Sequence, residues 1–282
     1  MDFTAVLAQI QPKLGCLADN LALVEKEILA ASASGGDLII FPELALTGYF
    51  LKDLVPEVAL RLDSPEILRL VELSRSISIA IGFVEETTDY HFYNSALYLE
   101  DGAIRHLHRK VYLPTYGLFD EQRYLAHGTT FRAFDSKFGR FGMVICEDMW
   151  HLSASYILAM DGATTLLCLS SSPARGIDGE TLGSAAAWQK LVSTTALFLN
   201  CRVLYCNRVG FEDGVNFWGG SEYIAPSGES VSRCKLLEPE ALSVRIDEGA
   251  LRRERIFSPM IRDENLFVTM QELARITRER GQ

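Results

Sequence analysis

Residues 39–49 read Ile-Ile-Phe-Pro-Glu-Leu-Ala-Leu-Thr-Gly-Tyr, and this stretch decides how the chain is built. The apolar run at its start is typical of a short buried strand. Pro42 stops this strand, so the carboxylate of Glu43 is expected at the rim of the sheet. A carboxylate partly removed from water there is a candidate general base. The alternative interpretation is an ordinary surface glutamate.

Outward from this stretch, strand and helix patterns mix along the whole chain. Helical spacing predicts helices at 19–32, from Ser64-Pro65 onward, at 152–161, at 180–199 and at 263–279. Strands are predicted at 3–11, 37–41, 77–84, 93–100, 103–108, 131–134, 138–146, 164–170, 201–209, 220–225, 231–235 and 242–246. Hairpins beside β-α-β connections exclude purely parallel winding and predict an α/β sandwich with mixed sheets.

The organisation is expected to be one domain over residues 1–282. No low-complexity linker or short repeat interrupts the chain. The polar helix predicted near its end suggests a C-terminal tail at about 263–282 that packs on a partner.

Composition limits the partners and the compartment. The formal net charge of −10 disfavours nucleic acid and anionic membranes. The six cysteines form no C-x-x-C pair, and several lie in apolar strand-like runs, as buried reduced thiols do. No signal peptide and no membrane-length apolar run is recognised. We therefore expect a cytoplasmic protein.

A second informative segment is 108–121, His-Arg-Lys-Val-Tyr-Leu-Pro-Thr-Tyr-Gly-Leu-Phe-Asp-Glu. Lys110 ends a predicted strand. Tyr116, Phe119 and a second carboxylate, Glu121, follow in a loop that could wall a small polar pocket. An ordinary surface lysine is the alternative, because most lysines are exposed.

The third segment is 141–150, Phe-Gly-Met-Val-Ile-Cys-Glu-Asp-Met-Trp. Cys146 at a strand end, before a turn into a helix, has the setting of a nucleophile elbow. Backbone N–H groups beyond it could stabilise an oxyanion. The neighbouring carboxylates oppose thiolate formation, so a nearby lysine would matter. A buried structural cysteine is the alternative.

Together the three segments supply what hydrolysis of an amide requires: a nucleophile, a base, and positive charge where the oxyanion forms. Their order resembles the nitrilase superfamily of carbon–nitrogen hydrolases, as do Tyr93-Asn94-Ser-Ala and Gly219-Gly-Ser221. Residues 110–121 and 145–150 look more narrowly like the glutaminase domain of glutamine-dependent NAD synthetases. The resemblance implies a four-layer α-β-β-α sandwich, a Glu–Lys–Cys triad, a thioester intermediate, and homodimers in which two sandwiches stack.

The resemblance also implies roles for particular residues. Glu43 would be the base, Lys110 the oxyanion partner and Cys146 the nucleophile, with the backbone N–H of Glu147 sharing the oxyanion. Further matched positions are the second carboxylate Glu121, the pocket residues Tyr49, Tyr116 and Phe119, and Ser171-Ser172 in an Ala-Ser-Pro-like segment. An aromatic residue often follows that segment, whereas this chain has Ala174, which leaves the recognition of the substrate's far end open.

Neither a metal nor a cofactor is expected. His106 and His108 share a strand face but lack a third ligand of suitable spacing. His151 lies too close to Cys146 in sequence to indicate a papain-like dyad. No G-x-x-x-x-G-K-[ST] or G-x-G-x-x-G loop is present, and Ser34-Gly-Gly-Asp37 is interpreted as a helix C-cap, not the phosphate loop of a synthetase.

The leading hypothesis is hydrolysis of a small amide, glutamine or similar, to acid and ammonia. One alternative is the ammonia-supplying glutaminase subunit of a two-chain amidotransferase, such as an NAD synthetase with a separate synthetase partner. A second is nitrile hydrolysis by the same triad. A catalytically idle scaffold is disfavoured because all three triad positions are filled.

Overall fold

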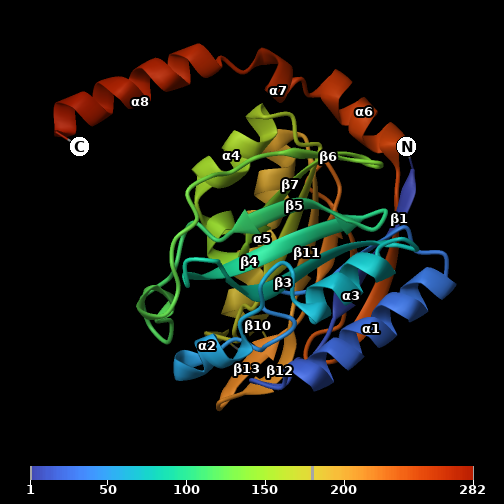
Figure 1. The fold of residues 1–282 in the computed structure, drawn as a ribbon. Helices are drawn as coiled ribbons and strands as arrows, with labels where there is room; N and C mark the ends of the chain where they lie inside the picture. Colours follow the sequence, from blue (N-terminus) through green and yellow to red (C-terminus); the bar gives the residue numbers. More distant parts are fainter. Residues whose placement is uncertain (1, 179–180, 282) are drawn as a thin grey trace.

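Two six-stranded sheets organise the computed structural model, which describes residues 2–178 and 181–281 (Figure 1). In the first sheet the three central strands are parallel, and antiparallel strands flank them on both sides. Its order is β16 (Glu240–Ile246), β1 (Phe3–Gln9), β2 (Leu38–Ile40), β3 (Ser78–Glu86), β4 (Phe92–Glu100) and β5 (Ala103–Arg109). The first strand of the chain thus pairs with one that lies more than 200 residues later.

The second sheet has the same plan, with a parallel centre between antiparallel edges. Its order is β15 (Ser230–Arg233), β14 (Glu222–Ile224), β11 (Arg202–Asn207), β8 (Thr165–Ser170), β7 (Gly139–Ile145) and β6 (Phe134–Ser136). Both sheets are therefore mixed, as the sequence predicted.

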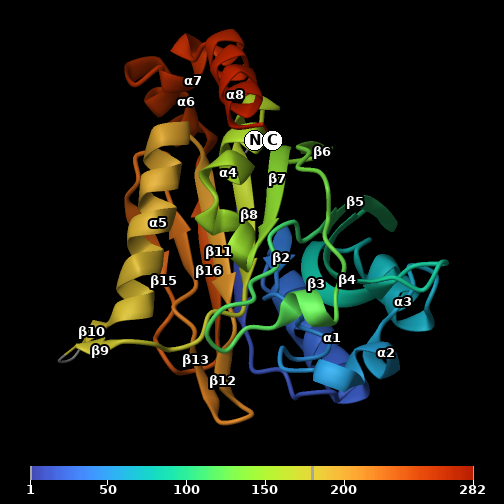
Figure 2. The ribbon, with the colours of Figure 1, turned by 90° about the vertical axis from the view of Figure 1, so that its left-hand side faces the viewer.

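Helices cover the outer face of each sheet (Figure 2). The pair α1 (Leu17–Ala33) and α3 (Pro65–Leu73) packs on the first sheet, and α4 (Leu152–Met160) with α5 (Gly183–Leu199) packs on the second. The chain ends in α6 (Glu248–Phe257), α7 (Met260–Asp263) and α8 (Leu266–Arg280). The short elements are η1 (Lys52–Leu54), α2 (Val55–Val58), η2 (Glu121–Arg123), η3 (Cys146–Trp150), β9 (Ile177–Asp178), β10 (Thr181–Leu182), β12 (Val209–Glu212) and β13 (Val215–Trp218).

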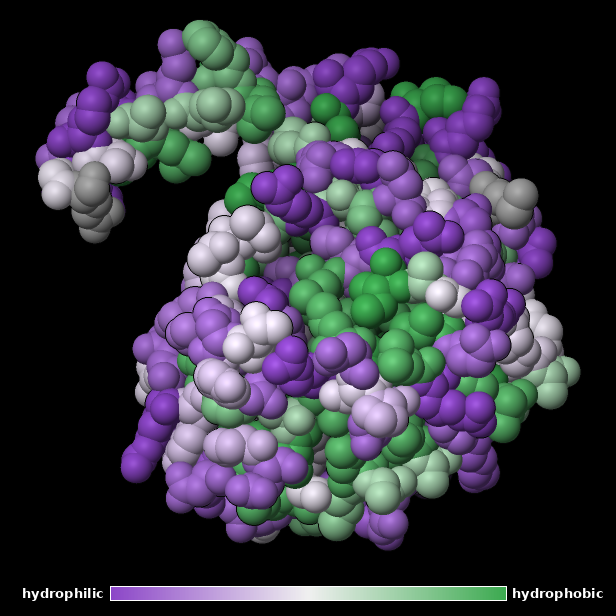
Figure 3. All heavy atoms as spheres, in the orientation of Figure 1, coloured by the Kyte–Doolittle hydropathy of each residue, from purple (hydrophilic) through white to green (hydrophobic). Residues whose placement is uncertain are grey.

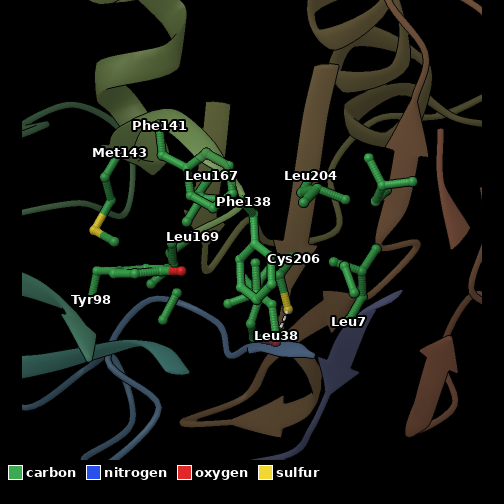
Figure 4. Packing of buried hydrophobic residues seen from close by; sticks show 14 of the residues in the cluster. Leu7, Leu38, Tyr98, Phe138, Phe141, Met143, Leu167, Leu169, Leu204 and Cys206 are labelled. Carbon is green, nitrogen blue, oxygen red and sulfur yellow. Dashed lines mark hydrogen bonds between the residues drawn. The ribbon is translucent and has the colours of Figure 1, made fainter. Parts of the chain in front are cut away.

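The hydrophobic core is divided into layers. One cluster fills the space between the sheets, where Leu38, Tyr98, Phe141, Leu167 and Leu204 meet (Figure 4). Two further clusters join each sheet to its own helices. This arrangement is the four-layer α-β-β-α sandwich, so the expected fold class is confirmed.

Several element boundaries differ from those predicted. The first helix begins at Leu17 and not at the Asp19-Asn20 pair, because the Asn20 side chain is buried and bonds to the backbone of Lys13 and Leu46. The strand expected at 131–134 lies at Phe134–Ser136. The helix expected from 180 begins at Gly183, because Thr181 and Leu182 form β10, which pairs with β9.

The strand predicted at 201–209 is wrong in its extent. It ends at Asn207, and Val209 begins a separate hairpin of β12 and β13. The hairpin turns at Asp213 and Gly214, whose φ values of 48° and 78° are both positive. Asp-Gly is the strongest short signal for such a turn, so the sequence did carry this information.

The C-terminal tail is helical, as expected, but it begins earlier with α6. The N-cap Asp247 accepts a hydrogen bond from the backbone N–H of Gly249. Helix α8 then arches away from the sandwich (Figure 1). Among the described residues, no helix is both long and apolar enough to cross a membrane.

Candidate active site

Glu43 lies three residues beyond Ile40, the last residue of β2, and is buried. Its Oε1 accepts hydrogen bonds from Lys110 Nζ at 2.7 Å and from Asn94 Nδ2 at 2.8 Å. Its Oε2 accepts from the backbone N–H of Ser171 at 2.8 Å, and the Ser171 hydroxyl donates to the Glu43 carbonyl. Strands of both sheets therefore hold this carboxylate in one orientation.

Lys110 follows β5 and is 1% exposed. Besides its bond to Glu43, its Nζ donates to Glu121 Oε1 at 2.6 Å. The hydroxyl of Tyr49 donates to the same Glu121 oxygen. The loop that carries Glu121 thus folds back over the lysine, and the two side chains are joined by a hydrogen bond.

Cys146 directly follows β7 and is the first residue of η3, where the chain turns out of the sheet. Its φ is 45°, in the left-handed region that non-glycine residues seldom adopt. Such strain persists where the surroundings fix the backbone, and it often marks functional sites. The Ser170 hydroxyl lies 3.4 Å from Cys146 Sγ. The strand–turn–helix setting expected of a nucleophile elbow is present.

The three side chains share one electrostatic environment. Burial raises the pKa of the Cys146 thiol well above its usual value; the Glu43 carboxylate adds to this, and Lys110 partly opposes it. The resting group is therefore a thiol, and it needs a base to become a nucleophile. Glu43 and Lys110 both act electrostatically on the thiol. Ser170, whose hydroxyl lies against the sulfur, directly precedes Ser171, whose N–H binds Glu43, so the base and the thiol belong to one buried region.

Burial acts in opposite directions on the pKa values of Lys110 and Glu121. For Lys110, burial is the largest influence and lowers the pKa, but Glu121 and Glu43 more than offset it and the pKa is raised. For Glu121, burial raises the pKa to about 7, although Lys110 acts in the opposite direction. Lys110 thus stays a cation without access to water.

A cavity of about 310 Å³ opens beside the Cys146 sulfur. This volume suits a small ligand. Its lining includes one cation, Arg175, and one carboxylate, Glu147. The other lining residues are Tyr116, Phe119, Trp150, Ser172, Pro173, Gly176, Gly183, Ser184, Ala187 and Trp188.

The matched pocket residues do not all lie in this cavity. Tyr116, Phe119, Glu147 and Ser172 line it. Tyr49 does not line this cavity, and its hydroxyl donates a hydrogen bond to Glu121.

Ser171 positions Glu43 and is fully buried. The Ser172 hydroxyl accepts from Trp218 Nε1, and its backbone N–H donates to Asn207. These two serines therefore support the site's walls and the base.

Three residues of the site were not predicted from the sequence. Asn94 was noticed only as part of a motif, and it proves to hold Glu43. Arg175 gave no signal beyond its position after the Ser-Ser-Pro segment; its guanidinium lies 4.6 Å from the Phe119 ring centre. In the sequence Asp148 is only an acidic neighbour of the cysteine, yet it is completely buried.

The histidines considered as metal ligands have other partners. His108 Nε2 is 2.8 Å from Asp148 Oδ2, and the His106 ring stacks on Phe134. Over residues 2–178 and 181–281, no cluster of three or more His, Cys, Asp or Glu side chains is arranged to hold a metal ion.

Comparison with known proteins agrees with this geometry. Residues 4–255 match the family model for carbon-nitrogen hydrolases. The chain belongs to the carbon–nitrogen hydrolase family, whose members act on carbon–nitrogen bonds other than peptide bonds.

Within this family, the glutamine-dependent NAD(+) synthetase of Synechocystis sp. is 33% identical over 288 residues, covering 94% of this chain and 50% of that protein. The N-carbamoylputrescine amidase of Solanum tuberosum is 26% identical and covers 85% of this chain and 84% of its own length. This chain thus spans about half the length of the synthetases it matches.

Solved structures give the same relation. The glutamine-dependent NAD+ synthetase of Acinetobacter baumannii superposes with a TM-score of 0.79 at 29% identity, over 89% of this chain and 47% of that one. A carbon-nitrogen hydrolase from Helicobacter pylori superposes with a TM-score of 0.84 at 22% identity, over 97% and 99%. The second likeness supports the fold.

Proposed function

We propose that this chain hydrolyses the side-chain amide of glutamine, or of a similar small amino-acid amide, to acid and ammonia. The observation that carries this proposal is the pair of opposite charges, Arg175 and Glu147, in the cavity beside Cys146. An amino acid carries a carboxylate and an ammonium group at its far end, and this pair is complementary to both.

The state of Arg175 supports a role in binding. Its Nε and Nη2 are buried and have no hydrogen-bond partner among the described residues. Buried polar groups are normally paired, so these unpaired donors leave the guanidinium with unused capacity to bind an anion. The Glu147 carboxylate already accepts from the Tyr116 hydroxyl at 2.9 Å, which holds it at the cavity wall.

The reaction would proceed in two halves. Cys146 Sγ attacks the amide carbon, a carbon–sulfur bond forms, and Glu43 takes the thiol proton. Lys110 Nζ and the backbone N–H of Glu147 stabilise the oxyanion. The carbon–nitrogen bond then breaks, and Glu43 gives its proton to the leaving ammonia.

In the second half, Glu43 removes a proton from water, which attacks the thioester. The carbon–sulfur bond breaks, the acid leaves, and Glu43 gives the proton taken from water to the sulfur, which restores the thiol. Each half needs one base and one oxyanion partner, and no redox step occurs, so the reaction requires no cofactor.

A second candidate is favoured by the similarity to glutamine-dependent NAD synthetases. The chain would then release its ammonia to a synthetase partner, and its turnover would depend on that partner. Two other substrate classes belong in the test because the same triad could hydrolyse them. They are nitriles, and carbamoyl compounds of the kind named for the amidase relative.

We also propose that the chain forms homodimers through its outer helices. Exposed apolar side chains gather on α4, α5 and α8. A groove of about 610 Å³ separates α8, here called the arm, from α4 and α5 on the body of the sandwich. Apolar side chains on both sides of a groove favour association, because burying them releases water, so a second copy of the chain is expected there.

The deciding experiment measures ammonia release from glutamine, from other primary amides, from nitriles and from carbamoyl compounds. Glutamine should be the best substrate of the pure chain, and Cys146→Ala should lose activity by many powers of ten while keeping its fold. Residual turnover of Cys146→Ala within about tenfold of wild type would exclude this nucleophile, since tenfold is only about 1.4 kcal/mol in the barrier. Activity that appears only with an added synthetase would favour the second candidate.

A further inference from the structure

Asp148 is a buried carboxylate that the proposed reaction does not use. It is 0% exposed, two residues beyond Cys146. Its Oδ1 accepts from the backbone N–H groups of Val111 and Tyr112, both at 3.0 Å. Its Oδ2 accepts from the backbone N–H of Ile145 at 3.1 Å and lies 2.8 Å from His108 Nε2.

These four contacts are made with residues that adjoin two proposed catalytic residues in the sequence. His108 precedes Lys110 by two positions, and Val111 follows it directly. Ile145 immediately precedes Cys146. One side chain thus joins the chain around the lysine, which comes from the first sheet, to the turn that carries the cysteine, which comes from the second.

The contacts also explain how the local backbone is held. The backbone of Lys110 is tied on its other side, where its N–H donates to the Asn94 carbonyl and its carbonyl accepts from Gly128. The bond from Ile145 to Asp148 closes the turn in which Cys146 has its positive φ. A carboxylate suits this position because three of the four partners are backbone donors.

We propose that Asp148 is a positioning residue that fixes Lys110 and Cys146 relative to each other, through His108, Val111, Tyr112 and Ile145. The inference rests on the proposed function, in which the lysine ammonium must lie at the oxyanion formed on the cysteine. A small displacement between such groups has a large effect on rate, because preorganised charge acts over short distances.

The substitution Asp148→Asn tests the inference with almost no change of shape. The amide NH2 can only donate, so it faces either the N–H of Ile145 or the N–H pair of Val111 and Tyr112, and at least one bond is lost. We expect kcat to fall by about tenfold to a thousandfold, the range for disturbing a preorganised site, with KM changed by less than about threefold. Labelling of Cys146 by a thiol reagent should change as well, because the turn around the sulfur is released.

The matched control is Glu100→Gln. Glu100 is also a buried carboxylate, and it accepts from Ser78, Tyr98 and the backbone of Lys137. Its substitution should lower the melting temperature comparably but leave kcat within about twofold, because none of its partners adjoins the site.

A second pair of variants leaves Asp148 in place. His108→Gln retains a side-chain N–H that can reach the carboxylate, whereas His108→Ala does not. We expect His108→Ala to lose turnover and His108→Gln to recover most of it. This pair decides the question if Asp148→Asn does not fold.

The inference is overturned if folded Asp148→Asn matches wild type in kcat and in thiol labelling, or if only KM rises. It is also overturned if His108→Ala and His108→Gln both turn over at the wild-type rate. Failure of the proposed function is distinguishable, because wild type would then release no ammonia while the labelling of Cys146 would still differ between wild type and Asp148→Asn.

Discussion

Lys110 has two carboxylate neighbours, Glu43 and Glu121. The second of them explains how Glu43 can act as a base while it is in contact with a buried lysine. Glu43 alone would be neutralised by its contact with the lysine at 2.7 Å. Glu121, at 2.6 Å from the same nitrogen, supplies the compensating charge. With both carboxylates ionised, Glu43 remains able to accept a proton from the thiol.

The substitution Glu121→Gln should therefore reduce turnover while preserving the shape of the site. We expect kcat to fall by about tenfold to a thousandfold, and KM to change less, because the loss acts on the proton transfer and the oxyanion. Steady-state kinetics with glutamine, paired with the rate of thiol labelling of Cys146, would measure it. Wild-type values in both would reduce the site to Glu43, Lys110 and Cys146.

The same residue predicts a pH dependence. Burial raises the pKa of Glu121 to about 7, so its carboxyl is neutral below that pH and ionised above it. Because ionised Glu121 balances the charge of Lys110 and leaves Glu43 free to take the thiol proton, kcat should rise as pH increases through about 7. The profile of Glu121→Gln should lack this rise and stay low, since the amide imitates the protonated form. An identical acid limb in the two proteins would contradict the assignment.

At the scale of elements, close packing of β3 against the segment after β2 positions the base. Gly82 in β3 has no side chain, and a Cβ there would lie 2.6 Å from the backbone nitrogen of Leu44 and 2.9 Å from the Cα of Glu43. Backbone cannot yield as a flexible side chain can. Glycine is therefore required for the short distance between this strand and the backbone of Glu43, the proposed base.

Gly82→Ala should displace Glu43 and lower kcat by about tenfold or more, in addition to an overpacking cost of about 1–3 kcal/mol. Gly142→Ala is the matched control, because its Cβ would meet only side-chain atoms of Leu158 and Leu166. Both variants should lose stability in thermal unfolding, and only Gly82→Ala should lose turnover at a temperature where both are folded. Equal turnover in the two variants would show that the close approach does not position Glu43.

The elements also show how far the sequence alone could lead. The apolar run before Pro42, the adjacent strands predicted at 93–100 and 103–108, and the strand end before Cys146 are local patterns, and the structure has strands at each of them. Contacts such as Asn94 with Glu43, or Asp148 with Val111, join residues far apart in sequence. Such contacts depend on which strand ends meet, and no periodicity reports that.

The whole molecule carries an arm that its own body leaves uncovered. Helix α8 extends from the sandwich, and hydrophobic side chains line it (Figure 3). Phe267, Met270 and Leu273 are 67%, 61% and 59% exposed. On the body, Leu152 and Phe198 face the groove between arm and sandwich, with exposures of 79% and 60%. Apolar surface on both sides of a groove favours association, because burying it releases water.

Leu273→Glu should therefore convert a dimer of the chain into a monomer. A carboxylate on the arm's apolar face would have to be buried without a partner in the dimer, which is costly, whereas in a monomer it stays in water. Light scattering after size exclusion, at micromolar concentrations, would report the mass. Tyr90→Glu is the matched control, since Tyr90 is 75% exposed and lies in the turn after β3, in the sheet that does not carry α4 and α5.

A wild-type chain that is monomeric at every concentration would refute the dimer, and a mass unchanged by Leu273→Glu would place the interface elsewhere. If the pure chain is monomeric but binds a synthetase through α8, and Leu273→Glu abolishes that binding, then the arm serves the partner and not a second copy.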